Sequence, residues 1–146
     1  MALEVVHKKM WVPYAREAVY QLIADIEAYA SFLPWCAASK VLRRWEGGVE
    51  ASLTLKKGGL SKSFITRNLE TLNERIEMHL ISGPFKHLYG VWQFVDKDNG
   101  VEVSLDLEFS FDNKLIAMMI GPVFQPVANT LLEAFMARAE AVCQKK

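Results

Sequence analysis

The sequence has few cysteines and histidines and no excess of charge. Its 146 residues include two cysteines and three histidines, and the formal net charge is zero. Cys36 and Cys143 fit no known metal or redox spacing, so we expect reduced thiols, no metal site and a cytoplasmic protein. Zero net charge gives no overall attraction to nucleic acid or to an anionic membrane. We also recognise no signal peptide and no apolar run that approaches membrane-spanning length.

What the chain does contain is the composition of a globular protein. Hydrophobic residues make up 51% and charged residues 23% of the sequence. This length suits about one domain, so we expect residues 1–146 to form a single domain. The charges are segregated, because residues 40–67 are mainly basic and residues 70–112 mainly acidic. Such runs are usually solvated strand faces; the alternative is a basic patch for an anionic partner.

The spacing of apolar residues predicts a strand, a helix, a meander of strands and a long final helix. Residues 4–12 are rich in β-branched and aromatic residues, which favour a strand, and residues 15–33 show helical spacing. Between residues 40 and 112, glycine-containing turns separate further strands. Residues 101–112 alternate six apolar with six polar residues, the pattern of a strand with one dry and one solvated face.

The last helical segment, residues 113–144, contains two prolines. Asn113 is the predicted cap of the helix. Pro122 and Pro126 interrupt the apolar stripe, and a proline inside a helix costs about 3 kcal/mol, so we expect a kink or a break near residue 121. A sheet of six to seven antiparallel strands must curl, and this helix must cover its inner face. The expected fold is α+β, and the gap under the helix is a natural pocket.

Residues 31–36, Ser-Phe-Leu-Pro-Trp-Cys, form an unusually apolar break between the first helix and the next strand. Aromatic side chains are typical of cores, so this loop could plug an open end of the curled sheet. Alternatively, it could gate the mouth of the pocket together with residues 83–85. Both interpretations can hold at once.

No catalytic motif is recognisable. A nucleophile elbow and a phosphate-binding loop are both absent. His7, His79 and His87 have no metal-ligand spacing, so we interpret them as surface or satisfied core histidines. Cys36 has no base nearby in the sequence. We therefore expect no enzyme, no catalytic residues and no required cofactor.

Four stretches of the sequence carry a resemblance to a known family: VPYAREAVYQLIADIEAYASFLPWC, SKSFITRN, GPFKHLYGVWQF and LEFSFDNKLI. In content and order they resemble the RatA-type ribosome association toxins and the mitochondrial coenzyme Q-binding proteins, of the START-like, polyketide cyclase superfamily. The resemblance covers about residues 3–143. The stretch GPVFQPVA departs from the family pattern, which puts a continuous final helix and the shape of the family's tunnel in question.

The resemblance implies a helix-grip (START/Bet v 1-like) fold with a hydrophobic tunnel between the final helix and the sheet. It implies a bound ubiquinone or other isoprenoid lipid, or binding to the large ribosomal subunit that blocks its joining with the small one, or both. It also implies a small antitoxin partner. The alternative is a polyketide cyclase-like or hydrolase enzyme that uses the same cavity, which would need an inward polar group with a shifted pKa.

Two sets of candidate residues follow. The ligand-binding candidates are large apolar residues of the strands, the apolar loop and the final helix: Phe32, Trp35, Phe64, Met78, Leu80, Phe85, Trp92, Phe94, Leu105, Leu107, Phe109, Met119, Val123 and Val127. The ribosome-binding candidates are the basic residues of the segregated region: Arg43, Arg44, Lys56, Lys57, Lys62 and Arg67.

Overall fold

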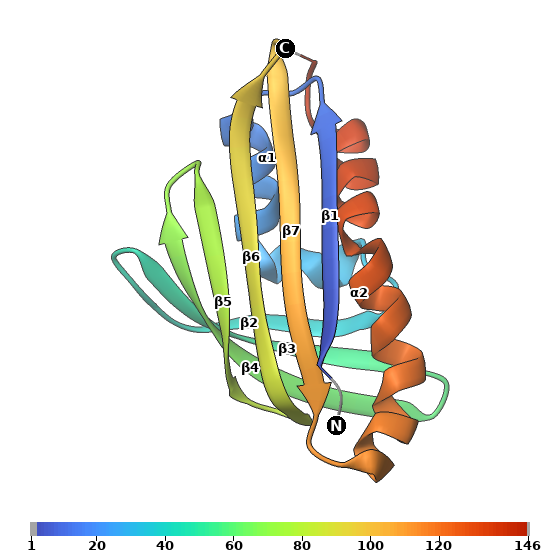
Figure 1. Ribbon diagram of the computed structural model, residues 1–146. Helices are drawn as coiled ribbons and strands as arrows, with labels where there is room; N and C mark the ends of the chain where they lie inside the picture. Colours follow the sequence, from blue (N-terminus) through green and yellow to red (C-terminus); the bar gives the residue numbers. More distant parts are fainter. Residues whose placement is uncertain (1–2, 146) are drawn as a thin grey trace.

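The computed structural model describes residues 3–145 of the chain. The predicted order of strand, helix, six strands and long helix is confirmed, with a short 3-10 helix added after the first helix (Figure 1). The elements are β1 (Glu4–Val12), α1 (Arg16–Ala24), η1 (Ile26–Ser31), β2 (Cys36–Trp45), β3 (Gly48–Lys57), β4 (Leu60–Thr71), β5 (Arg75–Ser82), β6 (Phe85–Lys97), β7 (Gly100–Phe111) and α2 (Lys114–Val142).

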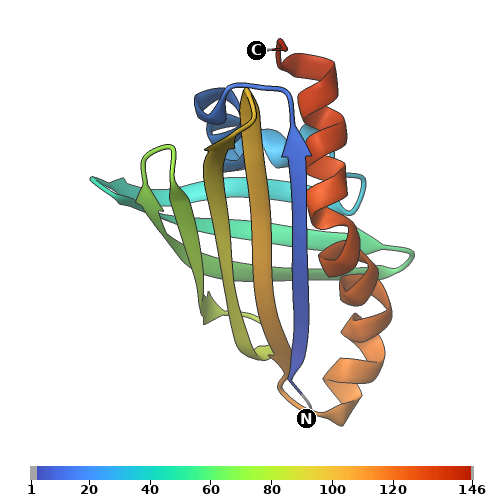
Figure 2. The same ribbon diagram turned by 45° about the horizontal axis from the view of Figure 1, so that its top comes forward.

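All seven strands form one antiparallel sheet in the order β1-β7-β6-β5-β4-β3-β2. Figures 1 and 2 show β5, β6, β7 and β1 lying roughly along one axis, with alternating directions, while β2, β3 and β4 cross behind them at a large angle, so the sheet is strongly bent. Register shifts interrupt the β2–β3, β4–β5 and β6–β7 pairs, and such bulges bend and twist a strand. The predicted curved sheet is therefore confirmed.

Strand β7 shows why the sheet has one dry face. Its apolar residues Val101, Val103, Leu105, Leu107 and Phe109 are all 4% exposed or less, while the residues between them are half-buried. A strand points successive side chains to opposite faces, so the strict alternation of the sequence places this apolar row under the helices. The predicted dry and wet faces are both present.

Helix α2 packs against β1 and β7, and α1 packs against α2 and β6. The predicted cap is confirmed, because the Ile116 N–H donates to Asn113 Oδ1 at 2.9 Å. A kink or a break was expected near residue 121, and the helix does not break there. The helix continues through Pro122 and Pro126, and Figures 1 and 2 show its axis bending instead.

Packing explains why α2 survives two prolines. Each proline lacks the N–H that would bond the carbonyl four residues earlier. Both proline rings are exposed. Phe124, which lies between the prolines, and Val127, which follows Pro126, are buried against the sheet. Apolar burial of this segment offsets the missing hydrogen bonds, since a large apolar side chain contributes about 1.5–3 kcal/mol.

The expectation that no apolar segment reaches membrane-spanning length is wrong for α2. Within the described residues, this helix alone is long and apolar enough to cross a membrane by length and composition. The apolar character has a local cause, because Ile120, Leu132 and Phe135 are buried under the sheet. Leu115 and Met118 on its first turns are exposed.

Candidate ligand-binding cavity

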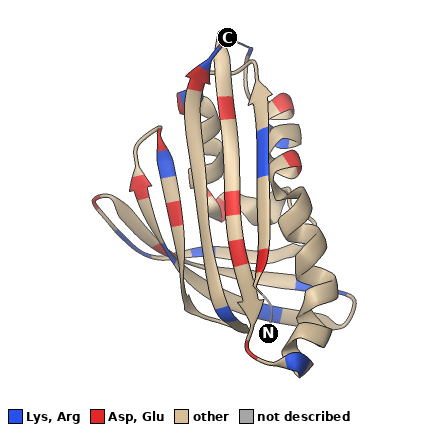
Figure 3. Cartoon of the chain, in the orientation of Figure 1, with Lys and Arg blue, Asp and Glu red and all other residues tan. Residues whose placement is uncertain are grey.

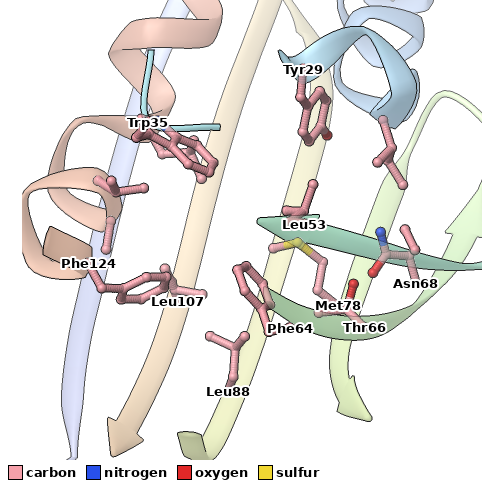
Figure 4. Close-up of a pocket in the computed structure, with 15 residues that line it drawn as sticks. Tyr29, Trp35, Leu53, Phe64, Thr66, Asn68, Met78, Leu88, Leu107 and Phe124 are labelled. Atoms are coloured by element: carbon pink, nitrogen blue, oxygen red, sulfur yellow. The ribbon is translucent and has the colours of Figure 1, made fainter. Parts of the chain in front are cut away.

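A cavity of about 70 Å³ lies between α2, the loop before β2 and the inner face of the sheet (Figure 4). An apolar cavity of about 150 Å³ is known to hold one benzene molecule, so a larger ligand requires the wall to move. The sheet contributes the apolar residues Ala51, Leu53, Phe64, Met78, Leu88 and Leu107. The helices and the loop contribute Ile26, Tyr29, Trp35, Phe124, Val127, Ala128 and Leu131.

Five of the fourteen predicted ligand-binding residues lie on the wall of this cavity. They are Trp35, Phe64, Met78, Leu107 and Val127. Three come from different strands, one from the apolar loop and one from α2, so the fold brings together residues that are distant in the sequence. Their contact with a ligand stays a prediction, but their convergence on one cavity is a property of the fold.

Five other candidates are core residues that lie away from the cavity wall. Trp92, Phe94, Leu105 and Phe109 are 2% exposed or less. Phe85, expected at the pocket mouth, is also buried, with its ring centroid 5.6 Å from that of Phe111. Aromatic rings from β4, β7 and α2 enclose it, so Phe85 is packed as part of the core and forms no gate.

The remaining candidates lie nearer the surface. Phe32 is half-buried, and its ring packs against Phe135 with the Arg138 guanidinium above it. Leu80 lines a surface groove between β5 and β6. Met119 is exposed, because it points away from the sheet, and Val123 lines an outer groove. None of the four reaches the cavity.

The apolar loop contributes both to the core and to the cavity wall, while its role as a gate stays a prediction. Leu33 is 1% exposed and belongs to the core, so part of the loop closes the end of the sheet. Trp35 lies on the cavity wall and also lines the outer groove, which includes Lys56, Lys57 and Pro126. The indole of Trp35 therefore stands between the cavity and the groove.

Two polar residues on the cavity wall, Thr66 and Asn68, were missed by the sequence analysis. Both are 6% exposed and follow Phe64 along β4 at every second position. Side chains two apart share a face of a strand, so the inward assignment of Phe64 already implied that Thr66 and Asn68 point inward. Asn68 Oδ1 is buried without a hydrogen-bond partner in the described structure.

The cavity offers little for acid–base chemistry. Tyr29 is the one ionisable residue on the wall that the structure describes, and its hydroxyl donates to the backbone carbonyl of Ile23. Burial raises the pKa of the Tyr29 hydroxyl above its ordinary value, so this group holds its proton. Cys36 lies nearby in the core, and burial raises the pKa of its thiol too. The wall can bury apolar surface and form hydrogen bonds.

The six predicted ribosome-binding residues form two groups at opposite ends of β3. Arg43 and Arg67 lie opposite Glu50 on the neighbouring strands, near one end. Lys56, Lys57 and Lys62 surround the turn between β3 and β4 at the other end. At about 3.3 Å per residue, the two groups are roughly 25 Å apart, so the sequence cluster is not one surface patch.

The arginine group is partly neutralised by carboxylates. Arg43 and Arg67 each donate to Glu50 at 3.0 Å, and Arg44 lies 3.7 Å from Glu70. The Arg67 and Arg43 guanidinium groups hold the pKa of the Glu50 carboxyl below its usual range. The Arg43 guanidinium also lies 5.0 Å from the Trp45 ring centroid. The result is an exposed basic and aromatic surface with reduced net charge.

On the outer face of β1, β6 and β7, polar side chains contact each other across neighbouring strands. Figure 3 shows acidic residues along β7 beside basic residues on β1. His7 pairs with Asp106, and His87 lies 3.6 Å from Glu108. Lys97 lies 3.2 Å from Glu102. The acidic run of the sequence is thus a solvated strand face, as the commoner interpretation holds. Residues 3–145 include no group of three or more His, Cys, Asp or Glu that could hold a metal ion.

Comparisons with known proteins agree with this architecture. The sequence profile of the family described as "Polyketide cyclase / dehydrase and lipid transport" matches residues 12–136. The "Ribosome association toxin RatA" of Pseudomonas aeruginosa is 40% identical, over 92% of this chain and 94% of that protein. The RatA of Escherichia coli K12 is 41% identical, over 90% of this chain and 84% of that protein.

More distant similarities cover the same region. The mitochondrial "Coenzyme Q-binding protein coq10" of Schizosaccharomyces pombe is 27% identical, over 94% of this chain and 88% of that protein. The crystal structure of the Zhui aromatase/cyclase from Streptomyces sp. R1128 superposes with a TM-score of 0.82 at 17% identity, over 95% of this chain and 94% of that one. A START superfamily protein from Mycobacterium smegmatis superposes with a TM-score of 0.79 at 22% identity, over 94% of this chain and 98% of that one. These two structures show a shared fold alone.

Proposed function

Because the chain belongs to the polyketide cyclase / dehydrase and lipid transport family, we propose that it is a binding protein that encloses an apolar ligand under α2. The ligand would be an isoprenoid quinone or a similar lipid. One observation carries this proposal: the cavity wall is almost entirely apolar, and its one ionisable group among the described residues is a tyrosine already bonded to the backbone. Such a wall gains free energy by burying apolar surface, at about 25 cal/mol per Å².

Binding without catalysis is also supported by what the relatives are called. The names of the bacterial and yeast relatives refer to ribosome association and to coenzyme Q binding. The aromatase/cyclase neighbour is too distant in sequence to argue for an enzyme. The cavity as it stands is smaller than a quinone ring, so we expect a ligand to displace side chains such as Met78, whose flexible thioether chain can adapt its shape.

The test places a larger side chain of α2 in the cavity. Ala128 is 1% exposed and lines the cavity, whereas Ala137 lies exposed on the same helix. We expect Ala128→Leu to weaken binding of a short-chain ubiquinone at least tenfold in a fluorescence titration, because leucine occupies the ligand's space. Ala137→Leu adds the same side chain outside the cavity and should bind as the parent does. Equal binding by all three proteins would contradict the proposal.

A second candidate function, association with the large ribosomal subunit, rests on the RatA relatives and on the arginine surface. Arg43, Arg44 and Arg67 lie beside the exposed aromatic ring of Trp45, a combination suited to RNA phosphates and bases. The zero net charge of the chain means that the attraction must be local. An antitoxin partner stays a prediction from the family resemblance.

The two groups of basic residues provide a matched experiment. We expect Arg43→Glu combined with Arg44→Glu to abolish co-sedimentation with the large subunit, and binding by the parent to weaken steeply with salt. Lys57→Glu combined with Lys62→Glu makes the same change of charge at the far end of the strands and should sediment as the parent does. Unchanged sedimentation of the arginine variant, with or without an effect of the lysine variant, would refute this surface.

A further inference from the structure

Two polar side chains interrupt the apolar wall of the cavity at one place. Thr66 and Asn68 are adjacent inward positions of β4, and each is more than nine-tenths buried. Figure 4 shows the Asn68 amide and the Thr66 hydroxyl on the cavity side of β4, beside Met78. Burying an amide without a hydrogen bond costs free energy, because the bond to water is lost and not replaced.

The protein itself leaves the Asn68 acceptor unsatisfied. Its Oδ1 has no hydrogen-bond partner among the described residues. The strand register explains this: Asn68 pairs with Val49 on β3 and with Met78 on β5, and neither neighbour has a side-chain donor. The Tyr29 hydroxyl, another donor on the wall, is committed to the Ile23 carbonyl. A hydrogen-bond donor on a molecule inside the cavity would satisfy this acceptor.

The charge of that molecule is also constrained. No Lys, Arg or His lies on the described cavity wall, so a carboxylate or phosphate buried there would have no counter-charge. No Asp or Glu lies on the described cavity wall either, so a cationic ligand would also have no counter-charge. An uncharged group that can donate one hydrogen bond fits both conditions.

We propose that Asn68 and Thr66 form the polar end of the cavity and select an uncharged, hydroxyl-bearing apolar ligand, a phenol or hydroquinone rather than a fatty acid. The ligand O–H donates to Asn68 Oδ1, and the Thr66 hydroxyl bonds the same oxygen of the ligand. A quinone carbonyl accepts but does not donate, so the reduced form of a quinone should bind better than the oxidised form. This inference rests on the proposed binding of an apolar ligand.

The test compares three single-ring probes of similar shape: p-cresol, toluene and p-toluate. In NMR titrations of the whole protein, we expect p-cresol to bind and p-toluate to bind at least tenfold more weakly. Asn68→Leu, which keeps the number and branching of the side-chain heavy atoms, should weaken p-cresol at least tenfold and leave toluene unchanged or tighter. Thr66→Val serves as a second, isosteric variant and should weaken p-cresol by a smaller factor. A raised melting temperature of Asn68→Leu is expected as well, because an unpaired buried group is removed.

The outcomes separate the two proposals. If toluene binds and Asn68→Leu leaves p-cresol affinity unchanged, the polar end is refuted while the apolar cavity remains. If p-toluate binds as tightly as p-cresol, the restriction to uncharged ligands is wrong. If neither p-cresol nor toluene binds the parent protein, both the polar end and the proposed ligand-binding function are overturned.

Discussion

Gly90 of β6 lies directly opposite Met78 of β5, and a Cβ atom added at Gly90 would come within 2.5 Å of Met78 Cε. It would also lie 3.0 Å from Leu107 Cδ1 on the other side. Both neighbours line the cavity. The missing side chain of this glycine therefore gives Met78 and Leu107 the room to lie back from the cavity.

A methyl group at Gly90 should reduce ligand affinity. We expect Gly90→Ala to push the flexible Met78 side chain into the cavity and weaken binding of a short-chain ubiquinone by about tenfold, which corresponds to about 1.4 kcal/mol. The overpacking should lower the free energy of unfolding by about 1 kcal/mol. Gly59→Ala is the control, because nothing lies within 4 Å of its added Cβ. An affinity of Gly90→Ala equal to the parent's would contradict this account.

Removal of the Trp35 indole should change the rate of ligand exchange. Trp35 separates the cavity from the outer groove, and its backbone carbonyl accepts from the Lys56 N–H at 2.9 Å. We expect Trp35→Ala to raise both the association and dissociation rates several-fold in stopped-flow experiments. Trp45→Ala, on the exposed end of β2, should leave both rates unchanged. If Trp35→Ala exchanges ligand no faster, access lies elsewhere, as between β5 and β6 at Leu88.

Loss of the cap of α2 should be measurable in stability. Asn113→Ala removes the acceptor of the Ile116 N–H, and we expect a loss of about 1 kcal/mol in the free energy of unfolding by urea. Asn129 lies exposed inside the same helix, where its side chain donates to the Gln125 carbonyl. Asn129→Ala should be neutral or slightly stabilising, because alanine has the higher helix propensity. If Asn129→Ala lost as much free energy of unfolding as Asn113→Ala, the effect of Asn113→Ala could not be attributed to its capping position.

The protein should lose stability at high pH. Burial raises the pKa of Tyr20 to about 12, with a further contribution from the Glu70 carboxylate, and burial raises the pKa of Tyr29 as well. A tyrosine whose pKa is raised on folding stabilises the folded state fully below its unfolded pKa near 10.0. This contribution disappears as the pH rises through the folded value.

Denaturation by urea between pH 9 and 12 would measure this effect, with tyrosinate absorbance as a second readout. We expect Tyr20→Phe to show a shallower decline of stability above pH 10 than the parent. If the parent and Tyr20→Phe decline in parallel, ionisation of Tyr20 is not linked to folding.

Much of the fold was accessible to sequence reasoning because the signals are periodic and local. The alternation of residues 101–112 identified β7, glycine turns separated the strands, and Asn113 identified the start of α2. Each of these features depends on backbone geometry over a few residues. The effect of the two prolines in α2 was harder to predict, because their local cost in free energy predicts an interruption. The helix stays continuous because Phe124 and Val127 are buried against the sheet.

The candidate site was only partly accessible. A buried apolar residue such as Trp92 and a cavity residue such as Met78 look the same in the sequence, because both occupy inward positions of strands. Asn68 was missed for another reason: the loose alternation of β4 hid its inward position, although Phe64 shares its face. The basic cluster was misjudged because residues close in sequence along two antiparallel strands can lie at opposite ends of a hairpin.

The amino-acid sequence by itself therefore determined the family, the order of elements and the dry face of the sheet, since all three depend on residue identity and short-range spacing. Which inward side chains meet empty space, and which meet each other, was decided only by the bending of the sheet around α2. That bending depends on bulges, strand separation and packing among distant residues. The cavity and its unpaired Asn68 are consequences of these long-range contacts.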